Sequence, residues 1–207
     1  MKKSIISKIS IISVVVCVFL SCERESEIIF SPTGVPVDLG LSVKWASCNV
    51  GANSPEDYGD YFAWGEVIPK KKYSEANNSY KYNPKILPPH ADAATVNWGG
   101  AWRMPTDEEM AELRNNCTWT WTTQNGVNGY KVTSKKSGYT NNSIFLPAAG
   151  CRFGSSLSTA GSYGYYWSSS ISTDYPGYAW YVYFDSDNVY RYIYSRYNGL
   201  SVRPVCP

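Results

Sequence analysis

The C-terminal part of the chain concentrates side chains that suit binding. Of the 18 tyrosines in the whole chain, 11 follow Gly161. Successive side chains of a strand point to opposite faces. The run 180–185 would therefore present Tyr181, Tyr183 and Asp185 on one face, and Trp180, Val182 and Phe184 on the other. Tyrosine offers a large contact area, a polar tip and only two χ angles to immobilise. We therefore predict a recognition surface here.

The predicted ligand contacts share two properties: they follow residue 170, and their side chains can stack or form hydrogen bonds. Tyrosine rings would serve as rigid anchors, and short polar side chains would supply adaptable hydrogen bonds. We expect Trp167 and Val202 to support this surface together with the apolar face of the run 180–185. The predicted contacts are Tyr175, Tyr178, Tyr181, Tyr183, Asp185, Tyr190, Tyr192, Tyr194, Ser195 and Tyr197.

Residues that could catalyse a reaction are few. The single histidine, His90, lies in the loop sequence Pro88-Pro89-His90, and Cys206 is next to the C-terminus. An activated cysteine needs a nearby histidine, lysine or helix terminus to lower its pKa. We therefore expect no enzymatic activity, no catalytic residue and no cofactor.

The sequence Asp185-Ser186-Asp187-Asn188 is the best candidate for a cation loop. The positions at which an EF-hand requires glycine and glutamate hold Tyr190 and Arg196. We therefore interpret this segment as a polar turn and expect no metal site.

The N-terminus has the pattern of an export signal. Lys2, Lys3 and Lys8 precede an apolar run from 9 to 20, and Ser21-Cys22 follows. Cysteine after a small residue resembles a bacterial lipobox, so Cys22 would carry the lipid. The acidic stretch 23–27 resembles the surface-export signal of Bacteroidetes lipoproteins. We predict a lipoprotein signal peptide at 1–21, a tether at 22–34, a ligand-binding domain at 35–207, and attachment to the outer membrane at the cell surface. The alternative is an ordinary signal peptide with an incidental cysteine.

Charge and cysteine content narrow the partners and the chemistry. The net charge of +2 and the absence of a basic patch beyond Lys70-Lys71-Lys72 argue against nucleic acid as a partner. In an oxidising compartment, one or two disulfides are expected. Their pairing stays open, because four cysteines allow three complete pairings. The cysteines concerned are Cys48, Cys117, Cys151 and Cys206.

One helix and many short strands are expected to position these residues. The apolar residues of 35–46 recur at period two and predict a strand. Thr106 followed by Glu109 predicts a capping box, and Met110 and Leu113 continue at helical spacing. Asn125-Gly126 and Asn128-Gly129 predict turns. Residues 68–90 are rich in Lys, Asn, Ser and Pro and predict a long surface loop. Together these features predict an α+β domain.

Three groups of segments carry a family likeness. Residues 37–46 (VDLGLSVKWA) open the domain, and 98–109 (WGGAWRMPTDEE) introduce the helix. Residues 146–150 (LPAAG), 164–170 (GYYWSSS) and 199–205 (GLSVRPV) close it. The chain resembles the Fibrobacter succinogenes major paralogous domain of Bacteroidetes lipoproteins, over residues 36–206. This resemblance implies a C-type-lectin-like fold, in which the terminal strands pair and a late sheet carries the ligand face. The Glu-Pro-Asn and Trp-Asn-Asp signatures of calcium-dependent lectins are missing.

The choice of residues at the predicted contacts suggests a genetic origin. Tyr, Asp, Ser, Gly and Ile can each be reached from an asparagine codon by changing adenines alone, whereas Lys and Glu cannot. The last lysine is Lys136 and the last glutamate is Glu112. Diversity-generating retroelements mutate adenines, and their targets resemble this chain. The hypothesis is a variable protein whose diversified segment spans residues 153–200.

Three classes of function remain distinct at this stage. We expect a surface lipoprotein that binds a protein or a glycan through its tyrosine-rich C-terminal face. A second candidate is a structural subunit or adhesin of a pilus-like assembly. The third is an enzyme similar to the formylglycine-generating enzymes, which share the implied fold.

Overall fold

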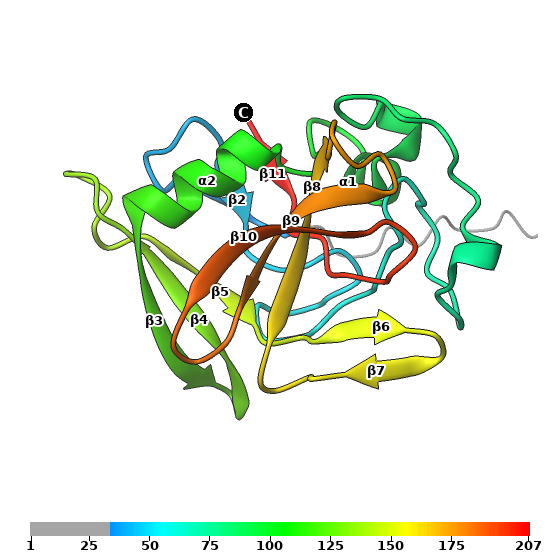
Figure 1. The fold of residues 1–207 in the computed structure, drawn as a ribbon. Coiled ribbons are helices and arrows are strands. Elements are labelled where there is room, and N and C mark those ends of the chain that lie inside the picture. The colour runs from blue at the N-terminus through cyan, green and yellow to red at the C-terminus, as the bar shows by residue number, and fades with distance from the viewer. Residues whose placement is uncertain (1–33) are drawn as a thin grey trace, which may run out of the picture.

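The structure is a computed structural model that describes residues 34–207, and the chain in it is mainly β-sheet (Figure 1). Of the described residues, 37% lie in strands and 13% in helices, and the strands form four small antiparallel sheets. The expected α+β, C-type-lectin-like fold is therefore wrong. The capping box identifies one helix, but a local signal does not say how much of a domain is helical. The predicted leader, the tether up to residue 33 and Cys22 lie outside the described residues.

The two ends of the domain meet in one small sheet. Its order is β1-β2-β11, so the terminal strands pair as expected. The predicted single strand at 35–46 is instead two short strands joined by the loop 38–43. Gly40 adopts φ +68°, and its N–H donates to Asp38 Oδ1 at 2.7 Å, which turns the chain back on itself. The strands are β1 (Pro36–Val37), β2 (Lys44–Ala46) and β11 (Val205–Cys206).

The predicted helix is present as α2 (Asp107–Asn116). Glu109 N–H donates to Thr106 Oγ1 at 3.2 Å, and Thr106 N–H donates to Glu109 Oε2 at 2.8 Å. This reciprocal pair is the predicted capping box. Met110 and Leu113 are buried, as their spacing indicated. The other helical segments are short: η1 (Glu75–Asn77), η2 (Pro89–Ala91) and α1 (Ala93–Trp98).

A second sheet follows α2, in the order β3-β4-β5. Asn125 and Gly126, with φ of 48° and 81°, form the predicted turn between its first two strands. The turn predicted at Asn128-Gly129 is wrong, because both residues lie inside β4. A Cβ at Gly129 would lie 2.3 Å from the Leu146 carbonyl oxygen, so glycine permits close approach of β5. The strands are β3 (Cys117–Gln124), β4 (Val127–Ser134) and β5 (Ser143–Pro147).

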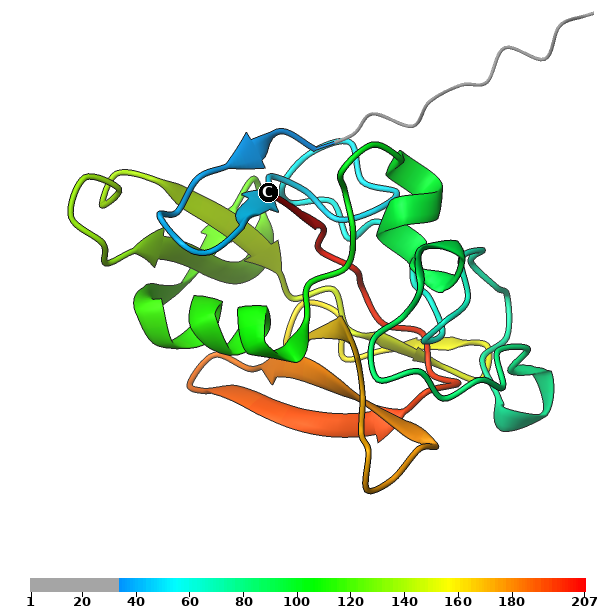
Figure 2. The same cartoon turned by 90° about the horizontal axis from the view of Figure 1, so that it is seen from above.

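The tyrosine-rich segment forms a third sheet, in the order β10-β9-β8. Helix α2 lies along one face of this sheet (Figure 2). A two-stranded hairpin, β6-β7, precedes the sheet in the chain (Figure 1). The strands are β6 (Cys151–Phe153), β7 (Ser156–Ser158), β8 (Gly164–Ile171), β9 (Tyr178–Phe184) and β10 (Val189–Ser195).

Each face of the third sheet contributes to a different apolar cluster. Val182 and Phe184 pack with Met110 of α2 in one cluster. Trp167 and Tyr181 pack in the other. Val182, Phe184, Trp167 and Val202 are buried, as predicted for the support of the binding surface.

A fully buried arginine fastens three parts of the chain together. Arg203 donates from Nε to Asn49 Oδ1 at 2.8 Å, from Nη1 to Ala46 O at 3.0 Å, and from Nη2 to Phe145 O at 2.8 Å. Burial lowers its pKa. Hydrogen bonds to neutral oxygens therefore compensate for the loss of water around the guanidinium.

The four cysteines of the domain are free thiols, so the expected disulfides are absent among residues 34–207. Cys48 and Cys151 belong to one apolar cluster and Cys117 to the other, and all three are buried. A free cysteine behaves as a small apolar side chain, so these three thiols pack in the core like other small apolar residues. Cys206 is half-buried in β11.

Candidate functional site

The strand register decides which of the predicted contacts share a surface. In β9 and β10, Tyr183 pairs with Tyr190 and Tyr181 with Tyr192. In β8, Tyr165 pairs with Tyr183. Paired residues of antiparallel strands lie on the same face. We call this surface the tyrosine face; it comprises Tyr165, Tyr181, Tyr183, Tyr190, Tyr192 and Tyr194.

The inner part of the tyrosine face belongs to the core. Tyr181 is only 5% exposed. Its ring is stacked 6.0 Å from Tyr165 and 5.7 Å from Tyr183, and it meets Trp167 edge-on at 6.0 Å. Tyr181 therefore stabilises the sheet and is not available to a ligand, contrary to the expectation from the alternating pattern.

The outer part of the same face is open. Tyr192 is 64% exposed and Tyr190 is 40% exposed. The ring of Tyr190 is stacked on Tyr183 with centroids 4.8 Å apart. Such pairs contribute about 0.5–1.5 kcal/mol beyond area burial, so the stack restricts the Tyr190 ring before any ligand binds. Tyr194 and Tyr183 are half-buried between the two parts.

Burial keeps the inner phenols protonated. Desolvation raises the pKa of Tyr181, Tyr165 and Tyr194 above the ordinary value of 10.0. Neutral hydroxyls donate and accept hydrogen bonds without adding charge to the face. The tyrosine face therefore offers rings and neutral hydroxyls, a chemistry suited to contact and poor for proton transfer near neutral pH.

Another part of the predicted site lies at the end of the β9-β10 ladder. Tyr178 pairs with Ser195, and both alternate with the tyrosine face. Tyr175 is exposed, with its ring 6.4 Å from Tyr178. Tyr197 is half-buried two residues beyond β10. Tyr178, Ser195 and Tyr197 line a cleft of about 380 Å³ and are not part of the tyrosine face; Tyr175 lies outside its lining.

Asp185 lies at the opposite end of the ladder, in the turn between β9 and β10. Its Oδ1 accepts hydrogen bonds from Asp187 N at 2.9 Å and from Asn188 N at 2.8 Å. This is the expected polar turn, in which a carboxylate satisfies backbone donors. Within residues 34–207 no three His, Cys, Asp or Glu side chains gather as a metal site would require. Asp185 and Asp187 line a hollow of about 470 Å³ with Tyr163 and Trp121.

The face opposite the tyrosines is closed by α2. Arg191 of β10 forms a two-point ion pair with Asp107 at the start of the helix. The same guanidinium lies 3.5 Å from the centroid of the Trp180 ring. These contacts hold the helix on the sheet, so the exposed side chains Tyr190 and Tyr192 lie on the face that the helix does not cover.

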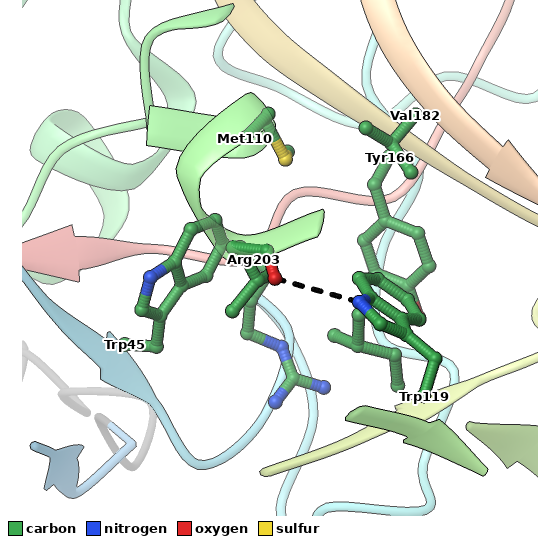
Figure 3. A pocket seen from close by; sticks show the side chains of 8 residues that line it. Trp45, Met110, Trp119, Tyr166, Val182 and Arg203 are labelled. Atoms are coloured by element: carbon green, nitrogen blue, oxygen red, sulfur yellow. Dashed lines mark hydrogen bonds between the residues drawn. The ribbon is translucent and has the colours of Figure 1, made fainter. Parts of the chain in front are cut away.

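An enclosed cavity occurs in the core between α2 and the sheets (Figure 3). Trp45, Met110, Trp119, Tyr166 and Val182 line it, and Trp119 Nε1 donates to Leu113 O at 3.4 Å. Its volume of about 10 Å³ is close to the least that can hold one water molecule. This space is a packing defect and cannot hold a ligand.

Most residues that line the 380 Å³ cleft were not predicted to contact a ligand, and Asn78, Tyr80 and Arg196 are among them. Asn78 and Tyr80 come from the segment expected to be an irregular loop, and Arg196 follows β10. The sequence did not single out Arg196, because Arg191 lies in the same tyrosine-rich segment. Arg196 is buried, as a paired or hydrogen-bonded cation can be.

The remaining groups with reactive potential are the buried cysteines and the single histidine. Burial raises the pKa of Cys117 and Cys151 to about 11, the direction opposite to activation. His90 is exposed at η2 and borders a shallow hollow with Tyr82, Pro84 and Pro88.

None of the helices in the described part of the chain is long and apolar enough to cross a membrane.

Comparison with known families gives one match. Residues 119–205 match the model of a family described as a domain of unknown function (DUF8237). The matched segment runs from β3 to β11 and contains the whole tyrosine face. No curated protein and no solved structure matches the chain.

Proposed function

We propose that the chain is a surface lipoprotein that captures a protein or glycan ligand through the outer part of its tyrosine face. The observation that carries this proposal is the exposure of Tyr190 and Tyr192 beside a rigid stack of rings. Exposed aromatic rings that are already ordered lose little conformational entropy on binding. Tyrosine is also enriched among the residues that dominate interface energies.

Binding without catalysis is the reading that the chemistry supports. The buried thiols of Cys117 and Cys151 have raised pKa values, and the His90 imidazole is exposed at a loop. The acids Asp107 and Glu109 are engaged with Arg191 and Arg103. The two paired acids stabilise structure, which leaves the tyrosine face as the best candidate for function.

A capture experiment tests the proposal. The full-length chain is immobilised and exposed to an array of glycans and to extracellular proteins, beside the double variant Tyr190→Ser/Tyr192→Ser. Because a few central aromatic contacts dominate typical interfaces, we expect capture to fall at least tenfold. Ile68→Ser is the matched control, since Ile68 is an exposed apolar residue elsewhere. Equal capture by the double variant and the wild type would contradict ligand binding by the tyrosine face.

Attachment to the membrane rests on Cys22, which lies outside the described residues. A single acyl chain binds a bilayer only weakly, and stable anchoring requires more than one lipid or basic signal. We expect Cys22→Ser to move the protein from the membrane fraction to the soluble fraction. Retention of the variant in the membrane fraction would contradict the lipid anchor.

We also propose that the C-terminal segment is diversified by adenine-directed mutagenesis. The exposed side chains Tyr178, Tyr190 and Tyr192 can then vary without disturbing the core, whereas the buried Tyr181 cannot. The test is to sequence the gene's neighbourhood for a reverse transcriptase and a near-copy of codons 150–205. A near-copy that differs only at adenines supports this part of the proposal, and absence of both contradicts it. Membership of the lipoprotein family that the sequence resembles stays a prediction.

A further inference from the structure

The cleft at the end of the β9-β10 ladder has properties of a binding site that is separate from the tyrosine face. One wall comes from the segment around η1 and includes Asn78 and Tyr80. The other comes from the turn before β9 and the end of β10, and includes Tyr178 and Tyr197. Its volume of about 380 Å³ lies within the range of small-ligand sites.

Arg196 holds the two walls together. Its Nη2 donates to the carbonyl oxygens of Tyr80 at 2.8 Å and Tyr82 at 3.0 Å. Its Nη1 donates to Asn83 Oδ1 at 2.7 Å and to Pro176 O at 2.9 Å. The guanidinium also lies 4.7 Å from the centroid of the Trp64 ring.

The wall around Tyr80 is fixed from behind as well. Ser79 N–H donates to Glu66 Oε1 at 2.6 Å. A Cβ at Gly65, which has φ +81°, would lie 2.1 Å from the Tyr80 ring, so glycine there lets the ring pack closely. A cleft whose walls are already fastened requires little ordering when a ligand enters.

Two buried donors at this cleft lack an acceptor among residues 34–207. They are Arg196 Nε and Asn78 Nδ2. Arg196 is only 6% exposed, and both residues line the cleft. An unpaired buried donor costs about 1–3 kcal/mol. A ligand oxygen placed between these groups would recover that free energy.

The charges around the cleft disfavour a cationic ligand, because Arg196 and Lys81 outnumber the single acid, Glu75. The Tyr80, Tyr178 and Tyr197 side chains provide apolar surface with polar tips. A neutral ligand with several hydroxyls and an apolar face complements both features.

We propose that this cleft is a carbohydrate-binding site that accepts a neutral sugar, with sugar oxygens accepting hydrogen bonds from Arg196 Nε and Asn78 Nδ2. Aromatic side chains of the walls contact the apolar face of the sugar ring. The site requires no metal ion. It does not depend on ligand capture by the tyrosine face, because the two surfaces share no side chain.

The test is a titration of the full-length chain with sugars. The readout is the NMR signals of the Arg196 Nε–H and of the Asn78 side-chain amide. The probes are glucose, galactose, mannose, fucose and N-acetylglucosamine, with choline and inorganic phosphate as ionic probes. We expect at least one neutral sugar to shift both signals in a saturable manner. No shift with any neutral sugar, or saturation by choline or phosphate instead, overturns the proposal.

Variants then locate the site. Asn78→Leu removes one donor and is expected to weaken sugar binding about tenfold. Tyr178→Leu removes a ring from the other wall and is expected to weaken binding without involving Asn78. Asn141→Leu, at an exposed asparagine outside the cleft, is the control and should leave sugar binding unchanged, and Tyr192→Ser tests whether the sugar binds at the tyrosine face instead. Unchanged affinity in both cleft variants would overturn the assignment, whereas loss of binding in Tyr192→Ser would place the sugar on the tyrosine face.

Discussion

The inner and outer tyrosines of one sheet face differ in what surrounds them and not in what they are. Tyr181 and Tyr192 are opposite each other across β9 and β10, yet the first is 5% exposed and the second 64% exposed. Tyr181 lies on the central strand and packs against Trp167 of β8 and the cluster that contains Cys151. Tyr192 lies on the edge strand of the sheet, where no further strand covers it.

This difference shows how one residue type serves two purposes on a single surface. The central rings bury apolar area and stack, which stabilises the sheet. The edge rings extend the same stack to the solvent, where a partner can reach them. A binding surface built this way is rigid because its inner members are core residues, so the two parts should respond differently to substitution.

The largest effect is expected from truncating the inner ring. Tyr181→Ala would leave a cavity against Trp167 and remove the stacking with Tyr165 and Tyr183. We expect a loss of about 3–5 kcal/mol in the free energy of unfolding. Urea denaturation measures it. A loss below about 1 kcal/mol would mean that Tyr181 is not a core residue, and the distinction between the two parts would fail.

The next effect is a loss of stability at alkaline pH. Buried phenols such as Tyr181 have a folded-state pKa raised above the ordinary 10.0, so the unfolded chain loses its phenolic protons first. Stability from this source is complete below pH 10 and falls as the pH rises toward the folded-state pKa. Cys117 and Cys151, raised from 9.0 to about 11, act in the same direction from pH 9. Urea denaturation of the wild type between pH 7 and pH 11 measures the decline.

The variant Tyr181→Phe sharpens this comparison, because it removes one buried titrating group and keeps the ring. Its stability should decline less steeply above pH 10 than that of the wild type. Tyr192→Phe is the matched control and should follow the wild-type curve. Identical pH dependence of all three proteins would contradict the assignment of Tyr181 to the core.

A smaller effect is expected at the border of the two parts. Tyr190 is partly exposed and stacks on Tyr183, so Tyr190→Ser should lower the free energy of unfolding by about 1 kcal/mol. Urea denaturation at neutral pH checks this value. A loss as large as that of Tyr181→Ala would show that the core extends to the edge strand.

The smallest effect on stability is expected at the most exposed ring. Tyr192→Ser should change the free energy of unfolding by less than about 0.5 kcal/mol, as is usual for surface substitutions. Thermal or urea unfolding of this variant beside the wild type checks the prediction. A clearly larger loss would show that Tyr192 is structural.

Local signals in the sequence predicted local structure well. The Thr106–Glu109 capping box and the Asn125-Gly126 turn are both present, because each depends on residues within a few positions. The same type of signal misled at Asn128-Gly129, where the glycine accommodates the Leu146 carbonyl of the next strand, β5. The period-two pattern of 35–46 likewise concealed the reversal at Gly40.

Properties that depend on distant contacts could not be predicted. Alternation placed Tyr181, Tyr183 and Asp185 on one face, but burial of Tyr181 depends on its central strand and on the cluster beneath it. The cleft was missed because Arg196 joins it to Tyr80, 116 positions earlier. The mainly β architecture depends on the number of strands that pair, which a single strong helix signal does not report.

The measurement that tests the central claim most directly is ligand capture by two variants that both stay folded, Tyr192→Ser and Tyr181→Phe. Immobilised full-length chains are compared with the wild type on the same glycans and extracellular proteins. We predict wild-type capture by Tyr181→Phe and at least tenfold weaker capture by Tyr192→Ser. Wild-type capture by Tyr192→Ser, or weaker capture by Tyr181→Phe than by Tyr192→Ser, would contradict this prediction.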